Sequence, residues 1–140
     1  MNWKYKGKDI LSHSDLDDRC TDFVYCLTFK DGMKYVGKKT IRSERRLKPT
    51  KEQLAIRKNY KRVEVKNIPF INYVGSSSEN KGREVVSKDI IYCCSNKRTA
   101  TYLETRLLMS NKCIESNEVF TNKNVLGKFF NNCLDGLIKD

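Results

Sequence analysis

The sequence predicts an α/β fold of the α+β kind, in which a small antiparallel three-stranded sheet is flanked by helices. The first observation is a dense run of β-branched and aromatic residues at 23–29, followed by a short turn and a second run at 33–41, which is typical of a β-hairpin. A third run of this kind spans 84–94. After it, residues 97–112 carry apolar side chains at helical spacing.

The length of 140 residues suits one domain, because a chain of about 150 residues hides roughly two-thirds of its surface on folding. Residues 1–22 mix charges with few apolar side chains, so we expect an irregular lead-in before a single domain over 23–140. No apolar run approaches the roughly 20 residues of a membrane span, and the first residues are too polar for a signal peptide. We therefore expect a cytoplasmic protein with no membrane partner.

The turn between the first two strands decides their register. The loop at 30–32, Lys-Asp-Gly, fits a three-residue connection that ends on a left-handed glycine. Tyr25 then pairs with Gly37 and Leu27 pairs with Tyr35, which puts both tyrosines on one side of the sheet. A two-residue turn would point the two tyrosines to opposite faces instead.

The middle and the end of the chain give weaker patterns. Residues 43–60 are charged and are interrupted by Pro49, and we expect a helix that begins near Thr50. The alternating segment after them breaks at Gly75. We expect the tail, 122–138, to form a short helix. The tail residues expected to pack inward are Val125, Leu126, Phe129, Phe130 and Leu134.

Positive charge is concentrated in one segment. The net charge is +11, and between Lys38 and Lys66 twelve Lys and Arg stand against three Glu, which leaves +9 there and +2 elsewhere. Such a concentration favours a polyanionic partner, with nucleic acid as the default, although a solvated helix that keeps the protein soluble is the alternative. We expect this segment to follow a DNA path and to contact phosphates rather than bases. The residues expected to bind DNA are Lys39, Arg42, Arg46, Arg57, Lys58, Lys61 and Arg62.

The six cysteines and the single histidine do not form a metal-binding pattern. No C-x-x-C pair is present, and Cys93 and Cys94 are adjacent, so a zinc site is disfavoured. We expect reduced, partly buried thiols and a surface position for His13.

A carboxylate interrupts the apolar face of the 97–112 helix. On a helical wheel Glu104 lies about 40° from Ala100, near the centre of the apolar stripe. Burying an unpaired carboxylate costs several kcal/mol, so Glu104 requires a cation, a donor or a cleft. An ion pair with the basic segment and a metal site are both open, since Mg²⁺ often takes only one or two protein carboxylates.

Two tyrosines ten residues apart head an ordered set of motifs. They are "FVY" at 23–25 and "YVG" at 35–37, followed by arginines, by Glu104 on a later helix and by an asparagine beyond it. This set resembles the GIY-YIG nuclease family. The stretches "KYVGKK", "YVGSS", "IIYCC" and "YLE" narrow the resemblance to the small phage-encoded endonucleases of that family, over roughly residues 23–128.

The resemblance implies a DNA endonuclease that uses Mg²⁺, or Mn²⁺ in its place, to hydrolyse a phosphodiester by in-line attack of water. The catalytic residues that it implies are Tyr25, Tyr35, Lys38, Arg45, Glu104 and Asn124, with Glu104 as the metal ligand. It leaves open which tyrosine acts on the water. The open alternatives at the other positions are Lys39 for Lys38, Arg42 or Arg46 for Arg45, and Asn122 for Asn124.

Residue chemistry agrees with these roles. Lysines beside the tyrosines would favour the phenolate, and arginine suits the charge that develops on phosphate.

Two departures from the family stand out: Phe23 occupies the usual position of a glycine, and 40–72 reads as a basic insertion. A nucleic-acid-binding protein with this fold but little nuclease activity is the second interpretation, with RNA as well as DNA open. Cutting both strands with one site would require a homodimer or two visits.

Overall fold

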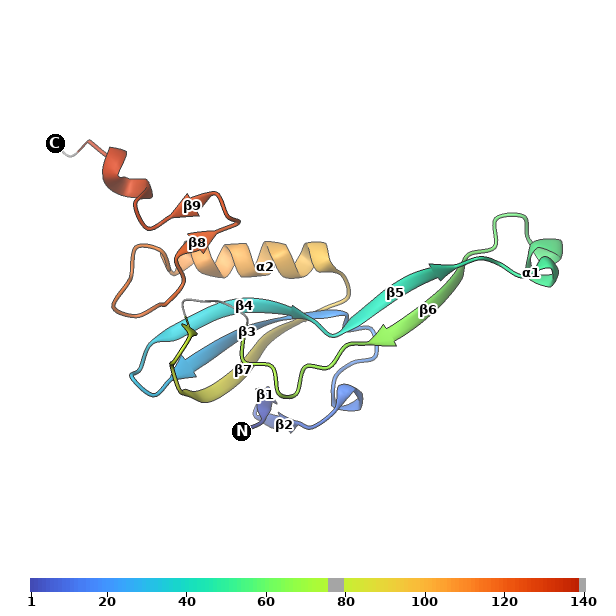
Figure 1. Ribbon diagram of the computed structural model, residues 1–140, viewed down its shortest axis with the longest axis horizontal. Coiled ribbons are helices and arrows are strands. Elements are labelled where there is room, and N and C mark those ends of the chain that lie inside the picture. Colours follow the sequence, from blue (N-terminus) through green and yellow to red (C-terminus); the bar gives the residue numbers. More distant parts are fainter. Residues whose placement is uncertain (76–79, 139–140) are drawn as a thin grey trace.

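The computed structural model describes residues 1–75 and 80–138, and its main body is a five-stranded sheet with helix α2 (Lys97–Ser110) lying across one face (Figure 1). The strand order is β2-β1-β7-β3-β4, and every neighbouring pair is antiparallel except β1 with β7. The strands are β1 (Trp3–Tyr5), β2 (Lys8–Ile10), β3 (Asp22–Phe29), β4 (Lys34–Thr40) and β7 (Val85–Cys94). The α+β class is confirmed, but the sheet has five strands and not three. The serines of the "YVGSS" motif beyond Gly75 lie outside the described residues.

The β3–β4 hairpin has the expected register. Tyr25 pairs with Gly37 and Leu27 pairs with Tyr35. The loop closes as a three-residue connection, with the Phe29 amide donating to the Met33 carbonyl at 2.8 Å and Gly32 at φ +86°. Both tyrosines therefore point to the same face of the sheet.

The first 22 residues are ordered, contrary to expectation. Strands β1 and β2 extend the sheet, and the 3-10 helix η1 (His13–Asp15) follows them. Trp3 is fully buried, packs edge-on against Phe23 and Tyr25 at 5.0 and 5.2 Å, and donates its indole N–H to the Phe70 carbonyl at 2.9 Å. One tryptophan thus anchors a segment whose three-residue strands are too short to show a period.

Strand β3 supplies side chains to two cores, one on each face. Phe23, Tyr25 and Leu27 join the core that contains Trp3. Val24 joins the other core, beneath α2. No helix in the described part of the chain is long and apolar enough to cross a membrane.

Residues 42–67 form an arm that projects from the sheet (Figure 1). The arm consists of β5 (Arg42–Leu47), α1 (Lys51–Ile56) and β6 (Arg62–Asn67), with the two strands paired antiparallel. The helix begins where expected, because the Thr50 hydroxyl accepts from the Gln53 amide at 3.2 Å. The strands on either side were not predicted, since they bury almost nothing and so need no apolar alternation.

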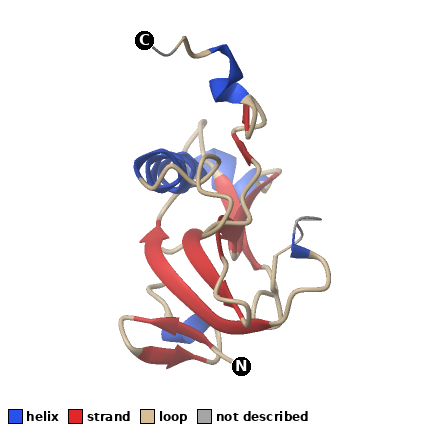
Figure 2. Cartoon of the chain, turned by 90° about the vertical axis from the view of Figure 1, so that its left-hand side faces the viewer, coloured by secondary structure: helices blue, strands red, loops and turns tan. Residues whose placement is uncertain are grey.

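The tail does not form the expected helix. It contains β8 (Asn124–Val125), β9 (Phe129–Phe130) and η3 (Cys133–Gly136) (Figure 2). Leu126 and Gly127 both have positive φ, and the Lys128 amide donates to the Val125 carbonyl at 3.1 Å, which makes a tight turn that cannot continue a helix. Of the five apolar tail residues expected to be inside, Val125 alone is buried, and the other four are about half exposed.

Candidate active site

Three tyrosines gather on the face of the sheet opposite α2. The ring centroids of Tyr25 and Tyr35 lie 6.4 Å apart, and those of Tyr25 and Tyr73 lie 6.1 Å apart in an edge-on arrangement. Tyr25 also shares a side-chain hydrogen bond with Tyr73. We call Tyr25, Tyr35 and Tyr73 the tyrosine cluster.

Two glycines border the Tyr25 hydroxyl. A Cβ placed on Gly37 would lie 2.5 Å from the Tyr25 Oη, and one placed on Gly75, at φ +88°, would lie 3.7 Å from the same atom. Each glycine ends a Tyr-Val-Gly sequence, at 35–37 and at 73–75. The repeated motif therefore places two backbones without side chains beside one hydroxyl group.

The close approach at Gly37 gives a stability prediction. Gly37→Ala would push the Tyr25 ring out of its place, and we expect the melting temperature to fall by about 3–10 °C, the usual result of overpacking a core. Gly136→Ala is the control, since a Cβ there meets nothing within 4 Å. Thermal denaturation of both variants tests this, and an unchanged melting temperature for Gly37→Ala would show that the ring adapts freely.

Burial makes Tyr25 a poor base. Its side chain is 2% exposed, and desolvation raises the pKa of the hydroxyl far above its ordinary value, with the charges of Tyr73 and Tyr35 adding to the effect. The expectation that nearby lysines favour a phenolate is therefore wrong for Tyr25. Tyr35 is half-buried and is the more accessible member of the expected pair.

The two lysines that follow the second motif separate to opposite faces of β4. Lys39 pairs with Phe23 on the tyrosine side and places its Nζ 4.6 Å from the Tyr73 ring centroid. Lys38 turns toward α2, where its Nζ donates to the Thr101 Oγ1 at 2.6 Å. Each lysine thus supplies positive charge to one side of the edge strand.

Glu104 faces the sheet from α2, one helical turn from both Ala100 and Leu108, which are buried. Its carboxylate is half-buried and forms no ion pair or hydrogen bond with any residue in 1–75 or 80–138. Burial raises its pKa, and the charge of Lys38 lowers it in part. The carboxylate also acts on Tyr25, whose pKa it raises. Glu104 therefore lies on the α2 side of the sheet, across from the face that carries the tyrosine cluster, and its charge effect on Tyr25 is what links the two.

The donor set around Glu104 fits a hard cation held by a single carboxylate. The described residues include no group of three His, Cys, Asp or Glu that could hold a metal without help. Mg²⁺ accepts such a site, because substrate phosphate oxygens and waters complete its shell. A half-buried carboxylate with no ion-pair partner in the described part of the chain is the chemical feature that favours a cation here.

The expected arginines lie away from the tyrosine cluster. Arg45 and Arg46 are exposed on β5 of the arm, where they pair with Glu64 and Val63. Arg42 is buried at the root of the arm, and its guanidinium donates at 2.8 Å to the carbonyls of three residues. These are His13, Asp17 and Cys20. The expectation that Arg42 contacts DNA is not met, since all of these bonds serve the fold.

His13 helps Arg42 at this root. Its Nε2 lies 3.0 Å from the Ile41 carbonyl oxygen and 2.9 Å from that of Ile68, which are the residues just before β5 and just after β6. His13 is half-buried and is not the surface residue expected.

The other exposed arm cations lie near the tip. Arg57, Lys58 and Lys61 follow α1, and Arg62 begins β6 and donates to the Lys48 carbonyl at 3.4 Å. All four are exposed, as a phosphate-contacting role requires.

The two candidate asparagines have different surroundings. The Asn122 side chain is buried and pairs with both backbone groups of Val36, at 3.0 and 2.9 Å, between Tyr35 and Gly37. The Asn124 Oδ1 accepts from the Gly127 amide in the tail turn. Of the two, Asn122 therefore holds the edge strand that carries Tyr35.

Asn80 was not expected at this site. It is 9% exposed, its Oδ1 accepts from the Thr121 hydroxyl at 2.6 Å, and its Nδ2 is buried with no hydrogen-bond partner among residues 1–75 and 80–138. That nitrogen lies 3.8 Å from the position that a Cβ on Gly75 would take, beside the Tyr25 hydroxyl. No sequence pattern marks Asn80, whereas the second Tyr-Val-Gly could have indicated Tyr73.

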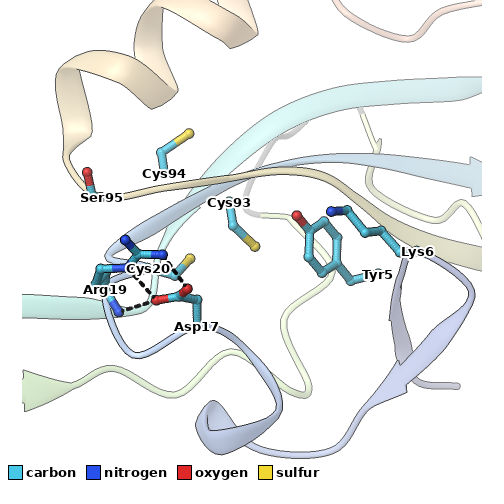
Figure 3. Close-up of a pocket in the computed structure, with 8 residues that line it drawn as sticks. All are labelled: Tyr5, Lys6, Asp17, Arg19, Cys20, Cys93, Cys94 and Ser95. Atoms are coloured by element: carbon cyan, nitrogen blue, oxygen red, sulfur yellow. Dashed lines mark hydrogen bonds and ion pairs between the residues drawn. The ribbon is translucent and has the colours of Figure 1, made fainter.

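A pocket of about 460 Å³ lies at the carboxyl end of β7, between β1 and the residues that lead into β3 (Figure 3). Two of its charged groups are paired with each other, because the Arg19 guanidinium binds the Asp17 carboxylate at 2.8 Å, and the third, Lys6, places its Nζ 5.3 Å from the Tyr5 ring centroid. Its thiols, from Cys20, Cys93 and Cys94, are free, as expected. None of the tyrosine cluster lines it, so it is separate from the candidate site.

The sequence matches one family model, described as "Putative endonuclease segE, GIY-YIG domain", over residues 3–132. No curated protein and no solved structure matches it. The match includes the strands β1 and β2, which the sequence motifs did not reach, as well as the tyrosine cluster and Glu104.

Proposed function

The chain belongs to the segE GIY-YIG endonuclease family, and on that premise we propose that it is a divalent-metal-dependent DNA endonuclease that hydrolyses phosphodiester bonds. The observation that carries the proposal is Glu104, a half-buried carboxylate without an ion-pair partner in the described chain, in electrostatic reach of Tyr25 and Lys38. A purely structural carboxylate at such a position would be expected to have a partner.

Glu104 would hold Mg²⁺ or Mn²⁺. The ion would supply positive charge for the phosphate, which stabilises the transition state of hydrolysis. The unpaired carboxylate, the oxygen chemistry of the site and the need for only one protein ligand support this assignment.

The other roles in hydrolysis are assigned to tyrosines and lysines of the protein. Tyr35 is the tyrosine proposed to position the attacking water and take its proton, because Tyr25 is buried and holds its own proton tightly. Tyr25, bonded to Tyr73, would set the position of the cluster. Lys39 would favour the Tyr35 phenolate from the same face, and Lys38 would contribute charge from the helix side.

Asn80 is proposed to donate its unpaired Nδ2–H to a phosphate oxygen. A buried donor without a partner costs about 1–3 kcal/mol, a cost that a bound phosphate would remove. The roles of Asn122 and Asn124 are then structural, in β4 and in the tail turn.

Asn80→Leu tests this role by removing the donor. We expect the cleavage rate to fall about tenfold, the value of one hydrogen bond to a charged group, while the free energy of unfolding stays within about 1 kcal/mol because an unsatisfied group disappears. Thr121→Val is the control, since it removes the bond to the Asn80 Oδ1 and leaves the Nδ2 in place. A full cleavage rate in folded Asn80→Leu would reject the role.

The position of the arm arginines favours a second candidate function. Because Arg45 and Arg46 lie on the arm and not at the tyrosine cluster, a protein that binds nucleic acid without cutting it is the alternative. Supercoiled plasmid incubated with Mg²⁺ or with EDTA separates the two. Metal-dependent nicking supports the endonuclease, whereas a gel shift without nicking supports the binding protein. Linear DNA formed without a nicked intermediate would indicate a homodimer, whereas linear DNA formed only after nicked circles accumulate would indicate two visits. A labelled RNA duplex tests RNA as substrate.

A further inference from the structure

The arm presents two different faces. Paired residues of β5 and β6 share a side of the ribbon, and successive residues alternate. Arg46 pairs with Val63 and Glu44 with Val65, and we call these four residues the valine face. The opposite face carries the charged residues Arg45, Arg62, Glu64 and Lys66.

The valine face is uncovered. Val63 and Val65 are 46% and 58% exposed, and β6 is exposed along its whole length. A two-stranded ribbon outside a larger sheet has little stability in water, and exposed valines on it gain nothing from the fold. The arm therefore has the properties of a segment that is completed by a binding partner.

The positive charge of the arm and the width of the DNA grooves indicate what that partner is. Residues 42–67 contain ten Lys and Arg and three Glu, which selects a polyanion. The major groove of B-form DNA is about 12 Å wide and admits a two-stranded ribbon, whereas the minor groove, at about 6 Å, does not. In the major groove, apolar side chains contact the methyl group of thymine, arginine contacts guanine and glutamate accepts from the amino group of cytosine. The valine face offers these chemistries through its two valines, Arg46 and Glu44.

We infer that the arm inserts into the major groove of duplex DNA with the valine face against the base edges. This inference rests on the proposed function and narrows its substrate to a duplex. The cations at the tip, Arg57, Lys58 and Lys61, then contact the phosphates, as expected from the charge pattern. The strands contact bases, which departs from the expectation that the whole segment contacts phosphates alone.

The root of the arm supports this use. Arg42 and His13 fix the residues at both strand ends to the body of the protein. An inserted ribbon is thereby held at a set orientation to β4, so that binding by the arm also places the duplex beside the tyrosine cluster.

Dimethyl sulfate footprinting in EDTA tests which groove of the DNA the arm occupies. The reagent methylates guanine N7 in the major groove and adenine N3 in the minor groove, positions that differ in access as the grooves do. We expect wild-type protein to protect guanine N7. We expect that protection to be lost when 43–66 is replaced by Asn-Gly, a turn that joins the paired residues Arg42 and Asn67. Protection of adenine N3 alone, or unchanged N7 protection in the armless variant, would overturn the inference.

Duplexes that contain either thymine or uracil test whether the valine face contacts the thymine methyl groups. Replacing thymine by uracil removes only the methyl group, and we expect wild-type affinity to fall about fourfold for each methyl that the valines bury. The double variant Val63→Ala with Val65→Ala should bind both duplexes equally. Val86→Ala is the control, because Val86 is 46% exposed on β7, outside the arm, and should behave as wild type. Equal binding of both duplexes by wild-type protein would reject contact through the valine face.

These measurements do not depend on cleavage. A protein that protects guanine N7 but never nicks DNA in Mg²⁺ retains the arm inference and loses the proposed nuclease function. A protein that nicks DNA without N7 protection keeps the function and loses the inference.

Discussion

Glu104→Gln is expected to abolish most of the nuclease activity and to leave the protein folded. The substitution keeps the shape of the side chain and removes the charge that would hold the divalent ion. We expect the nicking rate of supercoiled DNA to fall at least about a hundredfold, since a bound metal supplies several kcal/mol of transition-state stabilisation. DNA affinity in EDTA should be unchanged or tighter, because a negative charge near the phosphate has been removed.

The same variant has a stability readout that is independent of activity. Burial raises the pKa of Glu104 above its ordinary value of 4.5, so folding binds a proton more tightly at this site. Its contribution to stability is fully present below pH 4.5 and is lost as pH rises through the raised value. Glu104→Gln has no carboxyl group to ionise, so it does not lose stability as pH rises. The variant should therefore be more stable than wild type at neutral pH.

Mg²⁺ provides the matching control. It should raise the melting temperature of wild-type protein, because binding to the folded state alone stabilises it, and should leave that of Glu104→Gln unchanged. A variant that melts well below wild type at neutral pH would show instead that Glu104 is a structural partner of a cation. One that still cuts at the wild-type rate would remove Glu104 from the active site.

Tyr35→Phe is expected to lose activity and Tyr25→Phe to lose stability. Removal of a group that positions or deprotonates the attacking water costs about 10²–10⁴ in rate, and we expect Tyr35→Phe to fall in this range. Tyr25→Phe loses the bond to Tyr73 inside the core, which should lower the free energy of unfolding by about 1 kcal/mol.

Nicking rates and melting temperatures of both variants check this division of roles. Tyr102→Phe is the control, because Tyr102 is 63% exposed on α2 and should match wild type in both measurements. A large loss of rate in Tyr25→Phe together with a fully active Tyr35→Phe would reverse the assignment.

Sequence predicted the hairpin and its register because the rules there are local. A three-residue loop with a glycine at φ +86° decides which residues pair, and this placed Tyr25 opposite Gly37 and on the same face as Tyr35 before any tertiary contact was known. Glu104 was found for a similar reason, since a helical period shows a charge on an apolar face without reference to the rest of the fold.

The remaining parts depend on contacts between distant residues. Trp3 orders the first strands by packing on Phe23 and Tyr25, a contact that no local pattern contains. Asn80 reaches the site only because the chain returns to it after the second Tyr-Val-Gly. Arg42 resembled its basic neighbours in sequence, and only the carbonyls around it show that it is a buried anchor.

The root of the arm also bears on where DNA would be cut. Only Ile41 separates β4 from β5; it is fully buried, and its amide and carbonyl are held by Thr21 and Ile68, each at 2.8 Å. Antiparallel strands rise about 3.4 Å per residue, the same spacing as successive nucleotides along one DNA strand. The six residues of β5 therefore extend about 20 Å from this root. Because this root is fixed to the body of the protein, cleavage would fall at a nearly constant number of base pairs from the sequence that the arm reads, and the fragment ends would be nearly uniform.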